Sequence, residues 1–353
     1  MADPVASREA LERAAAAARV RVLALRSKTL QTLKSLIFAL AGDIRDELAQ
    51  FGGPDGRIPA TLLPTVSAFL EGRLSTFSDR WRRLIDEGIT EAARIGASLL
   101  ELVGRTGGDA QLVGQVVEYV RTFRAADGLQ LSDRIWRANN ATRDSLRAAI
   151  EGAIARGESS SQTAARYLRD GLPVPAPLQA GIAAAQPGAI GRSVLELLAK
   201  NAPGDPSFNL QRIIRTEVNR AYTESYVATV AQHPDVIGVK FNLSPNHPRT
   251  DVCDLHASAN VHGLGAGVYP PGNHPYPAHP QTLSFLTTVF ADQVTEADRA
   301  GRQTPFEWLR RQPTDAQDLI LGGKRKGFAF RNGDLKESEL RVPWYRIEER
   351  LNA

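Results

Sequence analysis

The chain is poor in sulfur, with one cysteine and one methionine in 353 residues. With Cys253 as the single thiol, no disulfide can form within the chain, so the fold cannot depend on oxidation. We therefore expect the protein to be made and kept in a reducing, aqueous compartment.

Long apolar runs are missing as well. The longest apolar cluster, residues 36–41, is far shorter than the roughly 20 residues that a helix needs to cross a bilayer. Residues 1–14 lack a basic segment followed by an apolar run, so we expect no secretory signal there and no contact with a membrane.

The remaining composition is ordinary for a globular protein, at 42% hydrophobic and 23% charged residues. The length allows two or three domains with a sizeable core. A formal net charge of +4 permits contact with nucleic acid or acidic partners, but it is too small to indicate either by itself.

The first 130 residues have the apolar spacing of long amphipathic helices. Apolar residues three and four apart predict a helix over residues 5–50, which the Gly52-Gly53-Pro54 turn ends. A second helix is predicted from Pro64 toward residue 102, and a shorter one over residues 109–126. These helices predict an elongated hairpin or bundle, which either packs on itself or docks on a larger assembly.

Two further segments complete the predicted organisation. Residues 131–206 contain a helix for which Ser132 is the predicted N-cap, a short helix over residues 159–171 and a linker rich in proline and glycine, where we place the main domain boundary. Residues 207–353 contain a helix over 210–232 and a strand over 236–243. The predicted fold is mainly α, with long N-terminal helices and a smaller α+β C-terminal domain.

Residues 247–280 hold five of the six histidines and the cysteine. Cys253 and His256 have the C-x-x-H spacing with which one tight turn can present two zinc ligands, and a histidine after the loop could return as a third. His247, Asp251 or Asp254 could complete a tetrahedral set. The candidate metal ligands are Cys253, His256, His279, His247 and Asp251.

Two other interpretations of this stretch stay open. Histidines in a loop rich in glycine and proline often bond backbone carbonyls that have no secondary-structure partner. Alternatively, a His–Asp pair with a bound metal could activate water for hydrolysis. Because the sequence lacks H-E-x-x-H, G-x-S-x-G and Walker motifs, we expect no enzymatic activity.

A basic turn is predicted at Lys324, Arg325 and Lys326, before an Asn332-Gly333 pair suited to a tight turn. The three cations could contact DNA through its phosphates. A solvated turn is the commoner explanation for three such residues.

Five segments together carry a resemblance to a known family. They are RTEVNRAY at 215–222, the strand at 236–243, HPRTDVCDL at 247–255, GLGAGVYPP at 263–271 and PYPAHP at 275–280. This series resembles the phage head morphogenesis proteins, which are minor capsid proteins related to protein F of phage Mu. The resemblance is specific over about residues 210–290 and looser over 131–171 and the C-terminal end. The first 130 residues add nothing to it beyond being helical.

The resemblance implies a virion component of a tailed phage or prophage. Such a protein is assembled in the cytoplasm of the bacterial host, associates with the portal protein, and lies inside the head in few copies. It assists head assembly or the passage of DNA, and it could also contact the capsid or packaged DNA. The alternatives are a metal-dependent hydrolase or toxin-like effector packaged in the virion, and a nonspecific DNA-binding protein.

The sequence departs from the family pattern at two places. Members commonly show C-D-x-C at the start of the loop and H-P-x-C-x-C at its end. Here the first motif ends in His256, and the second keeps only its histidine, with Thr282 and Ser284 at the positions of the two cysteines. A metal would therefore need His247, Asp251 or another loop histidine as a substitute ligand.

Overall fold

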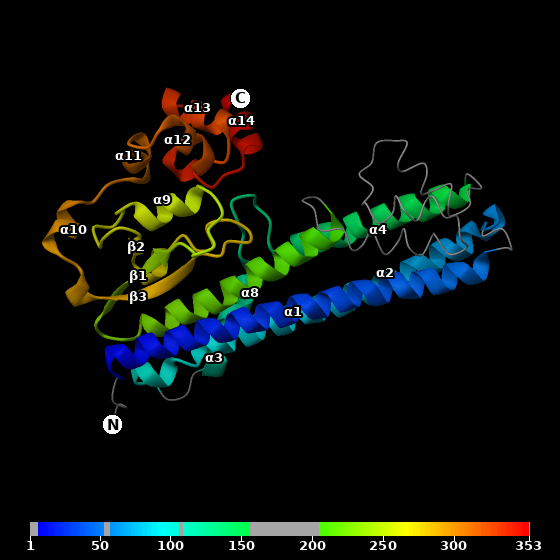
Figure 1. The fold of residues 1–353 in the computed structure, drawn as a ribbon, viewed down its shortest axis with the longest axis horizontal. Coiled ribbons are helices and arrows are strands. Elements are labelled where there is room, and N and C mark those ends of the chain that lie inside the picture. The colour runs from blue at the N-terminus through cyan, green and yellow to red at the C-terminus, as the bar shows by residue number, and fades with distance from the viewer. Residues whose placement is uncertain (1–5, 53–56, 106–108, 156–204, 353) are drawn as a thin grey trace. The chain divides into compact units, whose positions relative to one another are not determined.

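A computed structural model describes residues 6–52, 57–105, 109–155 and 205–352 (Figure 1). Most of these residues are helical, and a small antiparallel sheet of three strands lies among the C-terminal helices. The predicted fold class, mainly α with long N-terminal helices and a smaller α+β part, is confirmed.

The long helices follow the predicted apolar spacing. Helix α1 spans Arg8–Phe51, α2 spans Leu63–Ala97, α3 spans Asp109–Thr122 and α4 spans Leu131–Ala155. Ser132 thus lies in the first turn of α4 and not before it. The short 3-10 helices are η1 at Ala60–Leu62, η2 at Leu100–Val103, η3 at Pro271–Asn273, η4 at Ala291–Gln293 and η5 at Glu337–Glu339.

The chain divides into two compact units that are each built from separated segments. One unit takes Lys28–Asp86 and Asp133–Arg212, and therefore contains the second half of α1, most of α2 and nearly all of α4. Its core includes the fully buried Trp81, whose indole N–H donates to Asn139 Oδ1 over 2.7 Å. That bond satisfies the one polar group of the side chain.

The other unit takes the chain up to Ser27, Glu87–Ser132 and everything from Ile213 onward. It contains most of α8, which spans Pro206–Val230, and the whole sheet. The end of α2 packs closely on α8, where a Cβ at Gly96 would lie 2.7 Å from the backbone nitrogen of Tyr226. Ser225 Oγ donates to Ala93 O over 2.7 Å across the same contact.

The sheet has the order β2-β1-β3. Strand β1 spans Val236–Asn242, which confirms the predicted strand, whereas β2 at Val268–Tyr269 and β3 at Phe285–Phe290 were not predicted. Strand β3 is followed by η4 and α10, in a segment whose sequence shows no clear apolar period. Both neighbours of β1 pair with it antiparallel.

One face of the sheet meets helices. Val239 and Phe241 are fully buried there, because alternate side chains of a strand share a face. On the same face, Thr288 of β3 bonds the hydroxyl of Tyr226 in α8 over 2.7 Å, and Phe241 packs against His256 of α9. Figure 1 shows the three strands in the same part of the molecule as α9 and the C-terminal end of α8.

Short helices close the C-terminal part of this unit. They are α9 at Val252–Ser258, α10 at Glu296–Ala300, α11 at Pro305–Arg310, α12 at Thr314–Ile320, α13 at Lys324–Asn332 and α14 at Trp344–Asn352. Leu255, Leu309 and Ile347 are buried together in their core. Most of these helices are too short to show a clear apolar period in the sequence.

The predicted basic turn is wrong, because Lys324 begins α13. Lys326 is 6% exposed, and its Nζ donates to Leu340 O over 2.6 Å and to Val342 O over 3.0 Å. Gly333, with φ 84°, ends α13 in the left-handed conformation that a helix C-cap favours. The Asn332-Gly333 pair therefore stops a helix.

Within the described ranges, no helix has the length and apolar content that a membrane span requires. The short helix predicted at residues 159–171 and nearly all of the linker up to residue 206 lie outside those ranges. The division of the chain at residues 130 and 206 remains a prediction.

Candidate functional site

The site begins at the N-terminus of α9, where the sequence Asp251-Val252-Cys253-Asp254 forms a capping box. Asp251 Oδ1 accepts from Cys253 N over 2.7 Å, and Asp254 Oδ2 accepts from Asp251 N over 2.8 Å. Both bonds satisfy backbone N–H groups that have no partner inside the helix. The cap therefore fixes the two carboxylates and the thiol relative to one another.

The other side of the site is the loop that follows Pro277. Gln281 anchors this loop on α8: its N–H donates to Thr216 Oγ1 over 3.1 Å, and its Oε1 accepts from Arg215 Nη1 over 2.7 Å. Gln281 has φ 66°, which is uncommon for a residue other than glycine. Arg341 holds the start of the loop by donating to Pro277 O over 2.6 Å.

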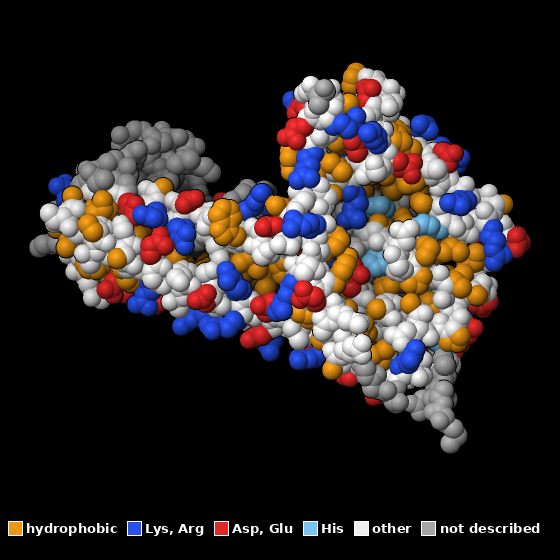
Figure 2. All heavy atoms as spheres, turned by 180° about the vertical axis from the view of Figure 1, so that it is seen from behind, with side chains coloured by type: hydrophobic (Ala, Val, Ile, Leu, Met, Phe, Trp, Pro, Cys, Tyr) orange, Lys and Arg blue, Asp and Glu red, His pale blue; other side chains and the backbone are white. Residues whose placement is uncertain are grey.

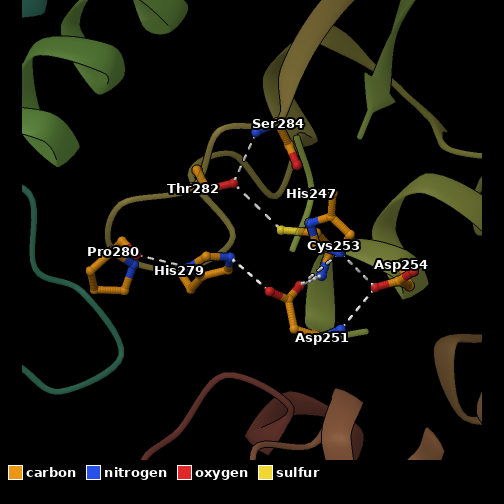
Figure 3. A network of polar contacts seen from close by, with 8 residues as sticks. All are labelled: His247, Asp251, Cys253, Asp254, His279, Pro280, Thr282 and Ser284. Carbon is orange, nitrogen blue, oxygen red and sulfur yellow. Dashed lines mark hydrogen bonds and ion pairs between the residues drawn. The ribbon is translucent and has the colours of Figure 1, made fainter. Parts of the chain in front are cut away.

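His279 reaches from this loop to the N-terminus of α9 (Figure 3). Its Nε2 lies 3.2 Å from Asp251 Oδ2, and its Nδ1 lies 2.8 Å from Pro280 O. The carbonyl orients the ring and accepts the Nδ1 proton, so that Nε2 faces the carboxylate. One ligand atom each from Asp251, Cys253 and His279 lie within 4.8 Å of one another.

A second group shares Asp251. His247 Nε2 lies 3.0 Å from Asp254 Oδ2 and 3.9 Å from Asp251 Oδ1, and these three residues also offer ligand atoms within 4.8 Å of one another. Four of the five predicted ligands are thus brought together at one helix end. Figure 2 shows histidine side chains reaching the surface on one face of the molecule, and 35% of the His279 side chain is exposed.

Electrostatics tie Asp251 to His279. Burial by itself raises the pKa of Asp251, but the hydrogen bonds from His279 and Cys253 N outweigh burial and lower that pKa to about 2. Burial likewise lowers the pKa of His279, yet the neighbouring Asp251 carboxylate and Cys253 side chain raise it to about 10. The two residues therefore form an ion pair at neutral pH.

The fifth predicted ligand, His256, is turned into the core. Its Nδ1 lies 3.2 Å from the hydroxyl of Tyr269, its ring packs against Phe241, and the residue is 7% exposed. Burial lowers the pKa of His256 to about 3, so the ring is neutral. The C-x-x-H spacing lies within helix α9, which sends Cys253 toward Thr282 and His256 toward β2.

Two polar residues next to Cys253 were not predicted as part of the site. Thr282 Oγ1 lies 3.4 Å from Cys253 Sγ and accepts from Ser284 N over 3.3 Å (Figure 3). The hydroxyl of Ser284 is buried with no hydrogen-bond partner among the described residues. The sequence did hold a signal for both, because they occupy the two cysteine positions of the H-P-x-C-x-C pattern.

Of the three cations predicted to contact nucleic acid, Lys326 is buried and cannot take part. Lys326 donates its protons to backbone carbonyls inside the unit, whereas the Arg325 side chain is 76% exposed and lies 3.5 Å from Glu348. Lys324 stands at the exposed start of α13. Two cations at one short helix end make a weak phosphate site.

Comparison with protein-family models, with curated proteins and with solved structures finds no significant match. The donor set itself fits zinc, which binds thiolate, imidazole and carboxylate together. Asp251, Cys253 and His279 would supply three ligands, and His279 already has the carbonyl partner that orients a zinc-bound imidazole.

Proposed function

We propose that this protein is a structural minor protein of a tailed-phage head, associated with the portal and assisting head assembly or DNA passage. The proposal rests on the family resemblance of residues 210–290. A protein of this kind needs a stable module that binds other virion proteins and needs no substrate pocket.

The observation that carries the proposal is the contact between Cys253 and Thr282. These residues lie 29 positions apart in the chain, yet Sγ and Oγ1 are 3.4 Å apart. In the resembling family, cysteines stand at the positions of Thr282 and Ser284. The contact supports the proposal, because a metal site of the family type requires these positions to lie next to the cysteine of the first motif.

Residues of the other motifs also contact one another. Arg215 and Thr216, in the RTEVNRAY segment, hold Gln281 at the end of the PYPAHP segment. Gly267 packs so closely on α9 that a Cβ there would lie 2.5 Å from Ala257 O, and Phe241 N donates to Gly267 O over 2.8 Å. Motif residues that join segments in this way favour a structural role over a catalytic one.

A zinc ion held by Asp251, Cys253 and His279 would belong to this structural role. It would link the start of α9 to the anchored loop, and its binding free energy would add to the stability of the folded unit. His247, 3.9 Å from Asp251, is the nearest further histidine.

Restoring the two cysteines tests the resemblance. The Thr282→Cys, Ser284→Cys variant should retain about one equivalent of zinc and show cobalt thiolate absorption, because thiolates are the preferred soft ligands. Leu283→Cys is the matched control, since that side chain lies between the two positions but is 43% exposed. Equal zinc content in the two variants would contradict the proposed correspondence.

The function itself is tested in virions. Induced particles of the phage that encodes the chain should contain the protein, and a tagged portal protein should co-purify with it from infected cells. Absence of the protein from purified DNA-filled heads, detected by mass spectrometry against the portal as internal standard, would refute the proposal.

One observation favours a second candidate, a metal-dependent hydrolase or packaged effector. The Asp251, Cys253 and His279 group offers three ligands, and three protein ligands leave a coordination position at which zinc can activate water. This candidate requires bound metal. Less than about a tenth of an equivalent of transition metal, after purification without chelators, excludes it.

A nonspecific DNA-binding role is the third candidate, and it requires an affinity that falls steeply with added salt. The burial of Lys326 weakens it.

A further inference from the structure

A hollow of about 670 Å³ lies between the first part of α1 and strand β3. From the strand, the four consecutive residues 286–289 line it. Because successive side chains of a strand point to opposite faces, a hollow lined by four in a row follows the edge of the strand. It also continues over one face of the sheet, where Lys240 of β1 and Val268 of β2 line it. We call this hollow the α1–β3 slot.

The opposite wall is one face of α1. Glu12, Ala15, Ala16 and Arg19 line the slot, at positions i, i+3, i+4 and i+7 of the helix. The two alanines in the middle carry a single methyl group each. The alanine-rich run of α1 therefore leaves room where larger side chains would fill the space.

Contacts at both ends hold α1 beside β3. The Arg8 guanidinium lies 5.0 Å from the ring centroid of Phe290, and that of Arg19 lies 3.1 Å from the ring centroid of Phe285. Eleven residues of helix and five steps of strand both span about 17 Å, so the two elements match in length. The part of α1 up to Ser27 and β3 belong to the same compact unit.

Strand β3 is an edge strand, since the sheet order is β2-β1-β3. Its outer backbone groups have no strand partner in the described part of the chain, and at one end Phe290 N donates to Gln293 Oε1 over 2.8 Å. An unpaired edge of this kind can bind extended peptides, which add one more strand through main-chain hydrogen bonds. Six residues of β3 give an added strand about 20 Å long.

The charges in the slot favour an acidic occupant. Of its two carboxylates, Glu12 pairs with Arg8 at 3.0 Å, and Asp298 Oδ2 accepts from Thr295 N and Oγ1 at 2.9 and 2.7 Å. Arg19 and Lys240 also line the slot: Arg19 lies over the Phe285 ring, and Lys240 adds its charge to the Thr295 hydrogen bonds that lower the pKa of Asp298. Lys240 lies opposite Thr287 in the sheet, so both cations are near the Phe285 end of β3.

We propose that the α1–β3 slot binds an extended acidic segment of another protein, which joins the sheet as a fourth strand beside β3. The strand edge would supply affinity through the backbone. Arg19 and Lys240 would select carboxylates at one end. This inference does not depend on the proposed role in a phage head.

The test uses the full chain and a fluorescein-labelled peptide of eight residues that alternate valine and glutamate. Binding should be saturable by fluorescence anisotropy, and it should protect amides of β3 from hydrogen exchange. Two matched peptides isolate the causes: one has lysine in place of glutamate, and the other is N-methylated at alternate residues. Each should bind at least about tenfold more weakly, because one reverses the charges and the other removes backbone donors.

Variants of α1 locate the site. Ala16→Leu places a larger side chain in the slot and should weaken binding about tenfold, since the added atoms have no free space once the peptide is bound. Ala17→Leu is the control, because Ala17 is an exposed neighbour that does not line the slot, and it should leave affinity unchanged. Lys240→Gln should weaken the acidic peptide about two- to fivefold and reduce the effect of salt.

Three results overturn the proposal. They are no saturable binding of the acidic peptide up to about 1 mM, equal binding of the N-methylated peptide, and equal effects of Ala16→Leu and Ala17→Leu. The two proposals can be told apart with the Ala16→Leu variant. Loss of peptide binding with unchanged portal co-purification supports the slot as a separate binding site and leaves the proposed function intact.

Discussion

The ion pair between Asp251 and His279 should make stability depend on pH in a way that reveals whether metal is bound. Their side chains are 24% and 35% exposed, and the atoms Oδ2 and Nε2 are 3.2 Å apart. The perturbation is a change of pH on the metal-free protein, followed by the same change in the presence of zinc.

Each of the two residues loses its contribution to stability at one end of the pH range. The pKa of Asp251 is lowered from 3.8 to about 2, so its contribution to stability is present above 3.8 and is lost as the pH falls toward 2. The pKa of His279 is raised from 6.5 to about 10, so its contribution is complete below 6.5 and is lost as the pH rises through 10. The metal-free protein should gain most from this pair at about pH 4–6.5.

The size of the effect follows from the same shifts. One pKa unit corresponds to about 1.4 kcal/mol. The two pKa shifts report the same interaction and cannot be added, and partial solvation of both side chains reduces the free energy that the ion pair contributes. We expect a loss of about 1–2 kcal/mol between pH 6.5 and pH 10, which is a fall of a few degrees in Tm.

Zinc should reverse the direction in which stability changes with pH. Metal binding requires a neutral His279 and a Cys253 thiolate, so zinc affinity and the stability of the zinc-bound protein rise with pH. Circular dichroism melts from about pH 5 to pH 10 in EDTA and with added zinc should show opposite slopes.

His279→Gln should flatten both pH profiles, whereas His262→Gln, which removes a loop histidine outside both ligand groups, should leave them intact. A metal-free wild type whose Tm does not fall between about pH 6.5 and pH 10, or whose fall survives in His279→Gln, refutes the reasoning.

Further predictions concern packing and buried charge, and urea unfolding checks each of them. Lys326→Met should lose about 2–3 kcal/mol because two buried carbonyls lose a charged donor, while Arg325→Met, at an exposed site, should change stability by less than about 0.5 kcal/mol. Gly96→Ala should lose at least about 2 kcal/mol because its Cβ would lie 2.7 Å from Tyr226 N. Gly72→Ala, with nothing within 4 Å, should instead gain up to about 1 kcal/mol.

The long helices could be predicted because their apolar spacing persists over many turns. Helix α1 is 44 residues long, so a few polar interruptions do not hide the pattern. Strand β3 has only six residues and continues directly into η4, so the segment shows no sustained period. Helix α13 was missed for a related reason: its apolar positions cover little more than one turn, and the three cations before them suggested a solvated turn.

The candidate site could be predicted only in part. Asp251 and Cys253 are two residues apart, and the D-V-C-D sequence is sufficient to place them together at a helix start. The position of His279 depends on the anchoring of Gln281 by α8, which is a tertiary contact that spacing does not reveal. His256 was wrongly predicted as a ligand of the same site, because C-x-x-H spacing does not fix where two side chains of a helix point.

The contacts of Thr282, Ser284 and the Asp251–His279 pair explain how this loop folds without a full set of metal ligands. At the two positions where the family that residues 210–290 resemble has cysteines, Thr282 and Ser284 are neutral and make a local hydrogen bond beside Cys253. The Asp251 carboxylate already has a counter-ion in His279, so the ion pair supplies the link between α9 and the loop that a metal would otherwise provide. Because a metal and the ion pair use the same two side-chain atoms, they are alternatives, and zinc must displace the His279 proton to bind. Zinc affinity should therefore be weak near pH 6 and should strengthen with pH. The Thr282→Cys, Ser284→Cys variant should shift this balance toward the metal by adding thiolates that do not compete with the ion pair.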